Sequence, residues 1–215
     1  GKVAVGKKVR FQSPDLVIEE IERLIKDYRV EGIYFADDMF DINKQRADVI
    51  CEKLIGKGLH KKIRWYPQLR ANSIEKRRVE LMKKAGAVRA DIGFESGSQR
   101  TLDTINKRTT VEQNYNAARV LHEAGLQFQA NIIVGIPGET EDDIKATEAM
   151  VRAIKPNWIG FGEFIPLPGS MLYCELMKQG LLKPEDVETM KQLNFTKMDD
   201  ATFEKWIEHI RNTIV

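Results

Sequence analysis

The ten residues Ala130–Glu139, ANIIVGIPGE, decide the expected fold of this chain. The apolar run Ile132–Val134 predicts a strand that is buried on both faces, as in a parallel sheet. The segment GIPG at residues 135–138 then removes side chains where the strand ends, so that a ligand can lie against bare main chain. Thr140 and Asp143 have the spacing of a capping box, which predicts the start of a helix. A turn between a buried strand and a helix is where α/β enzymes place their sites.

The same succession of helix, glycine, apolar strand and polar turn recurs through the chain. The expected strands are Gly32–Ala36, Ile63–Leu69, Val88–Phe94, Phe128–Val134 and Trp158–Phe161. Because helices separate these strands, the pattern predicts right-handed βαβ units and an open parallel sheet with outer helices, which is an α/β fold.

The residues after Ser170 show no strand pattern. Two helices are expected there, roughly at Glu185–Leu193 and Asp200–Ile214. We therefore expect two parts, a sheet domain at residues 1–170 and a helical C-terminal extension at residues 171–215.

The composition is ordinary for a soluble globular protein, with 42% apolar and 31% charged residues and a net charge of +2. So small a net charge argues against a dedicated nucleic-acid or membrane surface. No apolar run approaches the roughly 20 residues of a membrane span. The first ten residues, GKVAVGKKVR, lack the apolar region of a signal peptide, and a cytoplasmic location is expected.

The two cysteines, Cys51 and Cys174, belong to no cluster, so neither a disulfide framework nor a cysteine metal site is expected. Cys51 falls within a helical apolar pattern and is expected to be a small buried hydrophobe.

Polar residues gather where the expected strands end. They are Asp37 and Asp38 after the first strand, Arg70 after the second, Glu95 and Ser96 after the third, residues 135–139 after the fourth and Glu163 after the fifth. Because the carboxyl ends of parallel strands meet at one edge of a sheet, we expect a functional site there. Asp37, Asp38 and Asp41 offer the hard oxygen ligands of a magnesium ion. Asp41 fits equally well as the cap of the next helix.

Five segments, in this order, match a known family: GKKVRFQSPDLVIEEIERL, IYFADDMF, IGFESGSQRTLDTINKRTT, NIIVGIPGET and FIPLPGSMLY. They resemble the radical S-adenosylmethionine (radical SAM) superfamily, and more narrowly its branch of iron–sulfur oxidoreductases often fused to a cobalamin-binding domain. The resemblance implies an open, partial TIM-like (βα) barrel with one strand before those counted above. It also implies an enzyme that reductively cleaves S-adenosylmethionine through a 4Fe–4S cluster, to start radical chemistry on an unknown substrate.

The family holds its cluster with a CxxxCxxC loop after its first strand, and this sequence contains no such loop. We therefore expect a fragment that lacks the cluster ligands and is inactive by itself. The resemblance implies cobalamin as a further cofactor of the full-length protein. It implies a reductant such as ferredoxin or flavodoxin as a partner, besides the substrate, with neither nucleic acid nor membrane.

The resemblance also assigns site positions. The cofactor-binding positions that it implies are Asp37, Asp38, Glu95, Ser96, Lys107, Arg108, Gly135, Ile136 and Pro137. In the family, the acidic strand ends approach the methionine amino group or the ribose, the basic turn approaches the carboxylate, and the glycine–proline turn packs on adenine. Arg70 and Glu163 are assigned to substrate, and no metal ligand is assigned.

Two other hypotheses stay open from the residues alone. One is a metal- or phosphate-dependent α/β-barrel enzyme that uses Asp37, Asp38 and Glu95, and the other is a degenerate barrel that acts as a binding module. Because a missing first strand exposes a sheet edge, we also expect Val3–Phe11 or a neighbouring molecule to cover the strand Gly32–Ala36.

Overall fold

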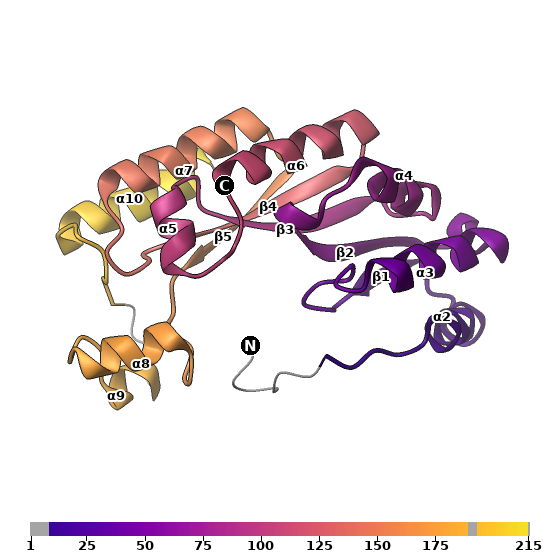
Figure 1. Ribbon diagram of the computed structural model, residues 1–215, viewed down its shortest axis with the longest axis horizontal. Helices are drawn as coiled ribbons and strands as arrows, with labels where there is room; N and C mark the ends of the chain where they lie inside the picture. The colour runs from indigo at the N-terminus through magenta and orange to yellow at the C-terminus, as the bar shows by residue number, and fades with distance from the viewer. Residues whose placement is uncertain (1–8, 189–192, 215) are drawn as a thin grey trace.

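A computed structural model describes residues 9–188 and 193–214 of the chain (Figure 1). Five parallel strands form one sheet in which each strand pairs with the next one in sequence. They are β1 (Gly32–Phe35), β2 (Arg64–Arg70), β3 (Arg89–Glu95), β4 (Gln127–Val134) and β5 (Trp158–Glu163). The parallel sheet confirms the α/β class, and the strand order is that of a barrel opened along one side.

One layer of helices covers the outer face of the sheet. Its members are α2 (Pro14–Tyr28), α3 (Lys44–Gly56), α4 (Lys76–Lys84), α6 (Val111–Ala124) and α7 (Glu141–Ile154). Each helix packs against the next in the order of the strands that they connect (Figure 1). Side-chain caps fix the starts of two of these helices: Ser13 accepts from Leu16 N (3.2 Å), and Thr110 N donates to the Gln113 side chain (3.0 Å).

The two faces of the sheet differ in character, because side chains alternate along each strand. The helix-covered face carries the apolar core, which includes Trp65, Ile92, Phe128 and Ile132, each at most 1% exposed. The inner face is polar and is lined by Tyr66, Gln68, Arg70, Arg89, Asp91, Gln129 and Asn131.

The expectation that the β4 strand is buried on both faces is therefore wrong, since its residues alternate between buried and more exposed positions. The physical reason is that helices cover only the outer face of the sheet, so the inner face does not need apolar side chains.

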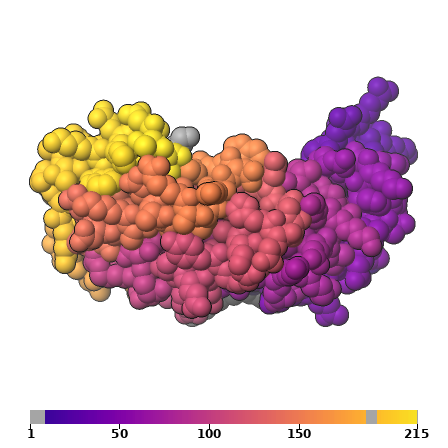
Figure 2. All heavy atoms as spheres, turned by 90° about the horizontal axis from the view of Figure 1, so that it is seen from above, coloured from indigo at the N-terminus to yellow at the C-terminus, as the bar shows by residue number. Residues whose placement is uncertain are grey.

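The C-terminal part contains α8 (Met171–Lys178), α9 (Pro184–Glu188) and α10 (Asp200–Thr213). The sequence pattern did not predict α8. Residues 189–192 of the first expected tail helix, Glu185–Leu193, lie outside the described residues, and α10 confirms the second expected helix. α10 packs onto the sheet domain, because Phe203, Ile207 and Ile210 form an apolar cluster with Val134 of β4 and Ile144 of α7. This end of the chain and the N-terminal helix lie at opposite ends of the molecule (Figure 2).

The edge of β1 is where a covering segment was expected. Most of Val3–Phe11 lies outside the described residues. Within the described part, β1 pairs only with β2, and residues 10–12 run beside α2. A cavity of about 410 Å³ lies between these residues, α2 and β1. No strand among residues 9–188 and 193–214 closes this edge.

Candidate functional site

A polar cavity of about 510 Å³ opens where β2, β3 and β4 end. It is lined by Asp38, Gln68, Leu69, Arg70, Asp91, Gly93, Glu95, Lys107 and Asn131. The lining therefore brings three carboxylates, two cations and two carboxamides together. The strand register explains this meeting, because Arg70 pairs with Gly93 and Gly93 pairs with Asn131 across adjacent strands. Such a lining suits a ligand that carries charges of both signs.

Glu95 and Lys107 form an ion pair at this cavity, with side chains only 14% and 17% exposed. The Arg70 guanidinium donates to the Lys107 carbonyl oxygen, and the Asn72 amide donates to the Arg108 carbonyl oxygen (3.1 Å). These contacts fix the loop that follows α5 (Gln99–Thr104) against the end of β2. The Lys107 ammonium is thereby held over the carboxyl end of β3.

Several backbone positions around the ion pair are strained. Glu95, Asn106 and Arg108 have left-handed φ angles of 64°, 52° and 56°, which non-glycine residues adopt rarely. The pairing of β3 with β4 also shifts register between Gly93 and Glu95, as at a β-bulge. Bulges and strained residues often re-aim a side chain at a functional site, and here they accompany the placing of the Glu95 carboxylate beside Lys107.

Ser96 lies beside this cavity but is fully buried. Its hydroxyl contacts the Thr147 hydroxyl of α7 (2.9 Å) and accepts from Ser98 N (3.1 Å). Ser96 therefore ties the end of β3 to α7, and the ligand role expected for its hydroxyl stays a prediction.

The turn after β4 is built around Glu139, whose side chain is buried. One carboxylate oxygen accepts from Gly135 N (2.7 Å) and Ile136 N (3.3 Å). Gly135 and Gly138 have φ angles of 84° and 78°, so the turn needs the glycines that the sequence provides. Burial raises the pKa of Glu139 to about 7, although the two backbone donors oppose that shift.

The helix that follows the turn begins with a fixed carboxylate. Thr140 N donates to Asp143 (2.8 Å), and the Ser98 hydroxyl donates to the other oxygen of the same group (2.5 Å). Burial by itself would raise the pKa of Asp143, but these hydrogen bonds, with Arg100, lower it to about 2. Asp143 therefore remains ionised and joins the start of α5, through Ser98 and Arg100, to the start of α7.

The structure separates the acidic residues that follow β1. Asp38 lines the polar cavity, whereas Asp37 lines the cavity at the β1 edge. Asp41 does not cap α3, because Asn43 does so through Arg46 N (3.0 Å). Asp41 is instead buried at 2% exposure, and burial raises its pKa. Within the described ranges, no group of three or more His, Cys, Asp or Glu side chains could hold a metal ion.

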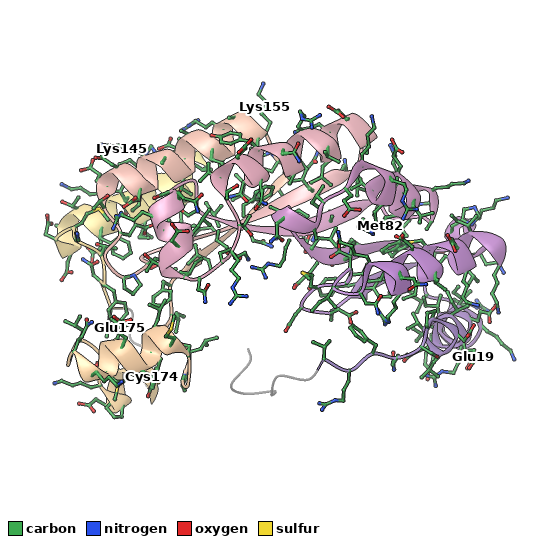
Figure 3. All side chains as sticks on the ribbon, in the orientation of Figure 1. Glu19, Met82, Lys145, Lys155, Cys174 and Glu175 are labelled. Atoms are coloured by element: carbon green, nitrogen blue, oxygen red, sulfur yellow. The ribbon has the colours of Figure 1, made fainter. Side chains whose placement is uncertain are left out.

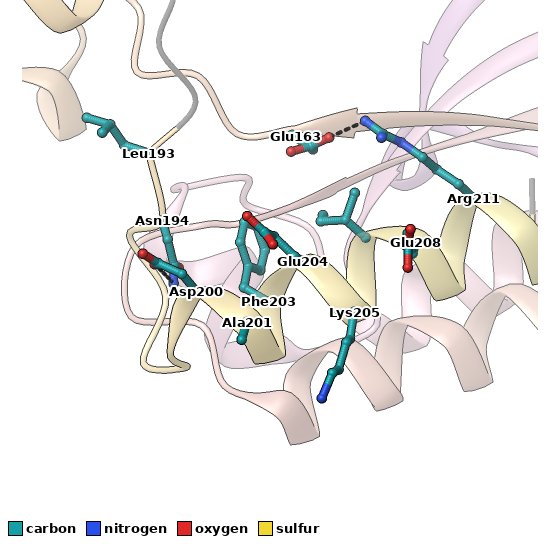
Figure 4. A pocket seen from close by; sticks show the side chains of 11 residues that line it. Glu163, Leu193, Asn194, Asp200, Ala201, Phe203, Glu204, Lys205, Glu208 and Arg211 are labelled. Atoms are coloured by element: carbon teal, nitrogen blue, oxygen red, sulfur yellow. Dashed lines mark hydrogen bonds and ion pairs between the residues drawn. The ribbon is translucent and has the colours of Figure 1, made fainter.

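Glu163 does not join Arg70, although both were assigned to substrate. Glu163 pairs in register with Val134, whose side chain belongs to the helix-covered face, whereas Arg70 belongs to the inner face. Glu163 accepts from Arg211 of α10 (2.5 Å) in a separate cavity of about 680 Å³ (Figure 4). This cavity is the larger one, but it lies between β5 and α10 rather than among the polar strand ends.

Sequence reasoning missed three inner-face residues that line the polar cavity: Gln68, Asp91 and Asn131. They occur inside the strands rather than after them. Side-chain alternation could have revealed them, because residues an even number of positions apart on a strand share a face. Each of the three lies two or four positions before a residue that was predicted at a strand end. Asp91 is held by two hydrogen bonds from Arg89 (2.8 and 3.1 Å).

The cysteines form no cluster in the structure. Cys51 is buried in α3, where desolvation raises the pKa of its thiol to about 12. Cys174 is exposed on α8 (Figure 3). No helix of the described residues is both long enough and apolar enough to cross a bilayer.

Comparison with known proteins places the chain in a family. The model of the Radical SAM superfamily matches residues 3–151. Anaerobic magnesium-protoporphyrin IX monomethyl ester cyclase of Cereibacter sphaeroides is 35% identical over 173 residues, which are 79% of this chain and 28% of that protein. An uncharacterized methyltransferase of Pyrococcus horikoshii is 31% identical over 194 residues, 90% of this chain and 41% of that protein. The chain thus spans well under half the length of these curated relatives.

Solved structures agree in fold. The radical S-adenosylmethionine methyltransferase TsrM of Kitasatospora setae, with cobalamin and a [4Fe-4S] cluster bound, superposes with a TM-score of 0.71 at 18% identity. That match covers 78% of this chain and 34% of TsrM. Coproporphyrinogen III oxidase (HemN) of Escherichia coli, a radical SAM enzyme, gives a TM-score of 0.63 at 14% identity over 93% of this chain and 45% of HemN. The family match, the relatives and the half-barrel agree: this chain belongs to the Radical SAM superfamily.

Proposed function

We propose that this chain forms the S-adenosylmethionine-binding core of a radical SAM enzyme that cleaves the cofactor reductively. The charge of the polar cavity is the observation that carries this proposal. Its three carboxylates and two cations leave one net negative charge, and S-adenosylmethionine has one net positive charge from its sulfonium, ammonium and carboxylate groups. The residues present therefore fit the cofactor in both the signs and the balance of charge.

Glu95 and Lys107 are the proposed contacts for the methionine end. A carboxylate fits an ammonium group, and the Lys107 ammonium fits a carboxylate group. In the absence of ligand, the two little-exposed side chains neutralise each other. When a zwitterion binds, its ammonium group can pair with Glu95 and its carboxylate with Lys107, so that no buried charge is left unpaired. Asp38, which lines the same cavity, and Arg108, in the same loop as Lys107, are proposed as further contacts. Asp37 lines the cavity at the β1 edge, so its proposed contact is through the backbone that it shares with Asp38.

Gly135, Ile136 and Pro137 are the proposed contacts for adenine. The positive φ of Gly135 makes the turn that presents the main chain of residues 135–137, of which Pro137 is partly exposed, to a flat ring. Ser96 directly follows β3, the strand that pairs with β4, and is a further proposed contact at this end of the cofactor site. Arg70 is kept in the proposal for substrate. Glu163 is also kept in the proposal for substrate, which it would contact from the helix-covered face of the sheet.

A 4Fe–4S cluster, when bound, supplies a low-potential electron to S-adenosylmethionine. Cys51 and Cys174 do not fit such a cluster, because one is buried in a core helix and the other is exposed elsewhere. No step is therefore assigned to cluster ligands in this chain. We propose that the full-length protein holds the cluster outside this chain, receives electrons from a small reductant such as ferredoxin or flavodoxin, and uses cobalamin as a further cofactor.

Calorimetric titration of the chain with S-adenosylhomocysteine tests the proposed site. Hydrogen bonds to charged groups contribute about 1.5–3 kcal/mol, so Lys107→Met is expected to weaken binding by at least about tenfold. The control is Lys145→Met, because Lys145 is an exposed α7 residue whose ion-pair partners in the described part of the chain are Glu141 and Asp142. Equal affinity in the wild type and in Lys107→Met would contradict the proposal.

A further inference from the structure

The turn after β4 is covered by the C-terminal segment of the chain. Residues 193–199 lead into α10, and both pack against residues 135–139. This segment is no part of the region that the family model matches, which ends at residue 151. Its contacts with the turn therefore need an explanation of their own.

Two backbone hydrogen bonds join the segment to the turn. Gly138 N donates to the Phe195 carbonyl oxygen (2.9 Å), and Lys197 N donates to the Glu139 carbonyl oxygen (2.8 Å). One bond runs in each direction between the two segments, so together they fix the position of the C-terminal segment along the turn, as in a short stretch of strand pairing. The turn is thus held on one side by its own Glu139 carboxylate and on the other by the C-terminal segment.

Phe203 of α10 packs directly against the turn at Gly135. A β-carbon built on Gly135 would lie 3.0 Å from Cζ of Phe203, so the ring occupies the space directly under the glycine. Phe203 is 6% exposed and belongs to the apolar cluster with Val134 and Ile144. Phe203 also lines the cavity beside Glu163 (Figure 4).

We propose that Phe203 is a positioning residue, which holds the Gly135–Pro137 backbone in the conformation that receives adenine. This inference rests on the proposed function and adds to it a C-terminal element that sets cofactor affinity. The physical reason is preorganisation: a turn already held in the bound conformation loses less entropy when the ligand arrives. A glycine-containing turn gains most from such support, since glycine has the largest conformational freedom.

The test uses 5′-methylthioadenosine, which has the adenosine part of the cofactor but no amino acid part. Its dissociation constant is measured by calorimetry for the 215-residue chain, for Phe203→Ala and for Phe203→Leu. The Leu variant keeps an apolar side chain in the cluster but is too short to reach Gly135. Both variants are expected to weaken binding by about fivefold or more.

Ile207→Ala is the matched control. Ile207 lies one turn further along α10, belongs to the same apolar cluster and is similarly buried at 7%. Its truncation is expected to lower the Tm about as much as Phe203→Ala but to leave the affinity within about twofold. Amide exchange of Gly138 gives a second readout, which is expected to speed up in the Phe203 variants and not in Ile207→Ala.

Three outcomes would overturn the inference. If the Phe203 variants bind 5′-methylthioadenosine as tightly as the wild type does, Phe203 does not position the turn, and the proposed cofactor site stands. If all three variants lose affinity in proportion to Tm, the effect is a loss of stability only. If the wild type itself does not bind, the proposed adenine site fails and the inference fails with it.

Discussion

Glu139 is the residue at which the geometry of the site depends on protonation. Its buried carboxyl group braces two amides of the turn, and its other oxygen has no hydrogen-bond partner among the described residues. Burial and the nearby Asp143 carboxylate raise its pKa and together outweigh Arg100 and the two backbone donors, which lower it. The fold therefore favours the neutral form of this acid below about pH 7.

The first prediction concerns stability against pH. The pKa of Glu139 rises from 4.5 in the unfolded chain to about 7 in the fold, so the unfolded chain holds fewer protons between these values. The contribution of Glu139 to the free energy of unfolding should therefore be fully present below pH 4.5. It should fall by about 3 kcal/mol as the pH rises to 7. Urea unfolding from pH 4.5 to 8 measures it, and Glu139→Gln should remove this component.

The opposite slope would contradict the assignment, and so would an unchanged slope in Glu139→Gln. Asp143 does not interfere in this window, because its pKa of about 2 lies below the range that is measured.

A second prediction concerns Glu95 and Lys107. Because the ion pair is little exposed, Glu95→Gln leaves the Lys107 ammonium without its counter-charge and should lower stability by about 1–3 kcal/mol. Glu95→Gln/Lys107→Met should recover part of that loss. Thermal unfolding of the single and double variants measures the coupling, and strictly additive losses would show that the pair does not interact.

At the scale of the elements, the sequence predicted what depends on local pattern. The five strands, the Thr140 capping box and the strand-end placement of Glu95 and Arg70 follow from periodicity and turn chemistry. The direction of each side chain did not follow as easily. Glu95 reaches Lys107 beside a register shift in the β3–β4 pairing, and no local residue pattern reports a shift that is set by tertiary packing.

Glu163 and Ser96 show the same limit. Glu163 ends β5 and Ser96 directly follows β3, but Glu163 lies on the helix-covered face and Ser96 bonds to α7. The positions were predicted from their place in the chain, whereas their surroundings depend on helices that lie far away in sequence. α10 is the clearest example, because it was expected only as an appended helix and in fact covers the turn after β4.

A third prediction concerns β5, whose inner face carries Gly160 and Gly162. A β-carbon on Gly160 would lie 2.1 Å from Asn131 Oδ1 and 2.7 Å from Gln129 Nε2, so those amides must move. Since moving them breaks the hydrogen bond between Gln129 and Asn131 (2.8 Å), Gly160→Ala should be less stable than the control by about 0.5–1.5 kcal/mol. Gly162→Ala is the matched control, since its nearest such contact is at 4.0 Å. Chemical denaturation compares the two, and equal effects would contradict the packing of this face.

At the scale of the whole molecule, the half-barrel leaves β1 paired on one side within the described residues. β4 has a partner on both sides. A fourth prediction follows: amides of β1 should exchange with solvent faster than amides of β4, because edge strands open locally at a lower free energy. Hydrogen-exchange mass spectrometry of the chain measures this. Equal protection of both strands would show that another segment covers the β1 edge.

The central claim is that the polar strand-end cavity and the turn after β4 together receive S-adenosylmethionine. A crystal structure of the chain soaked with S-adenosylhomocysteine tests it most directly. The account predicts the amino acid part of the ligand between Glu95 and Lys107 and the adenine against Gly135–Pro137. Ligand density in the cavity beside Glu163 and Arg211 instead, with the strand-end cavity empty, would contradict it.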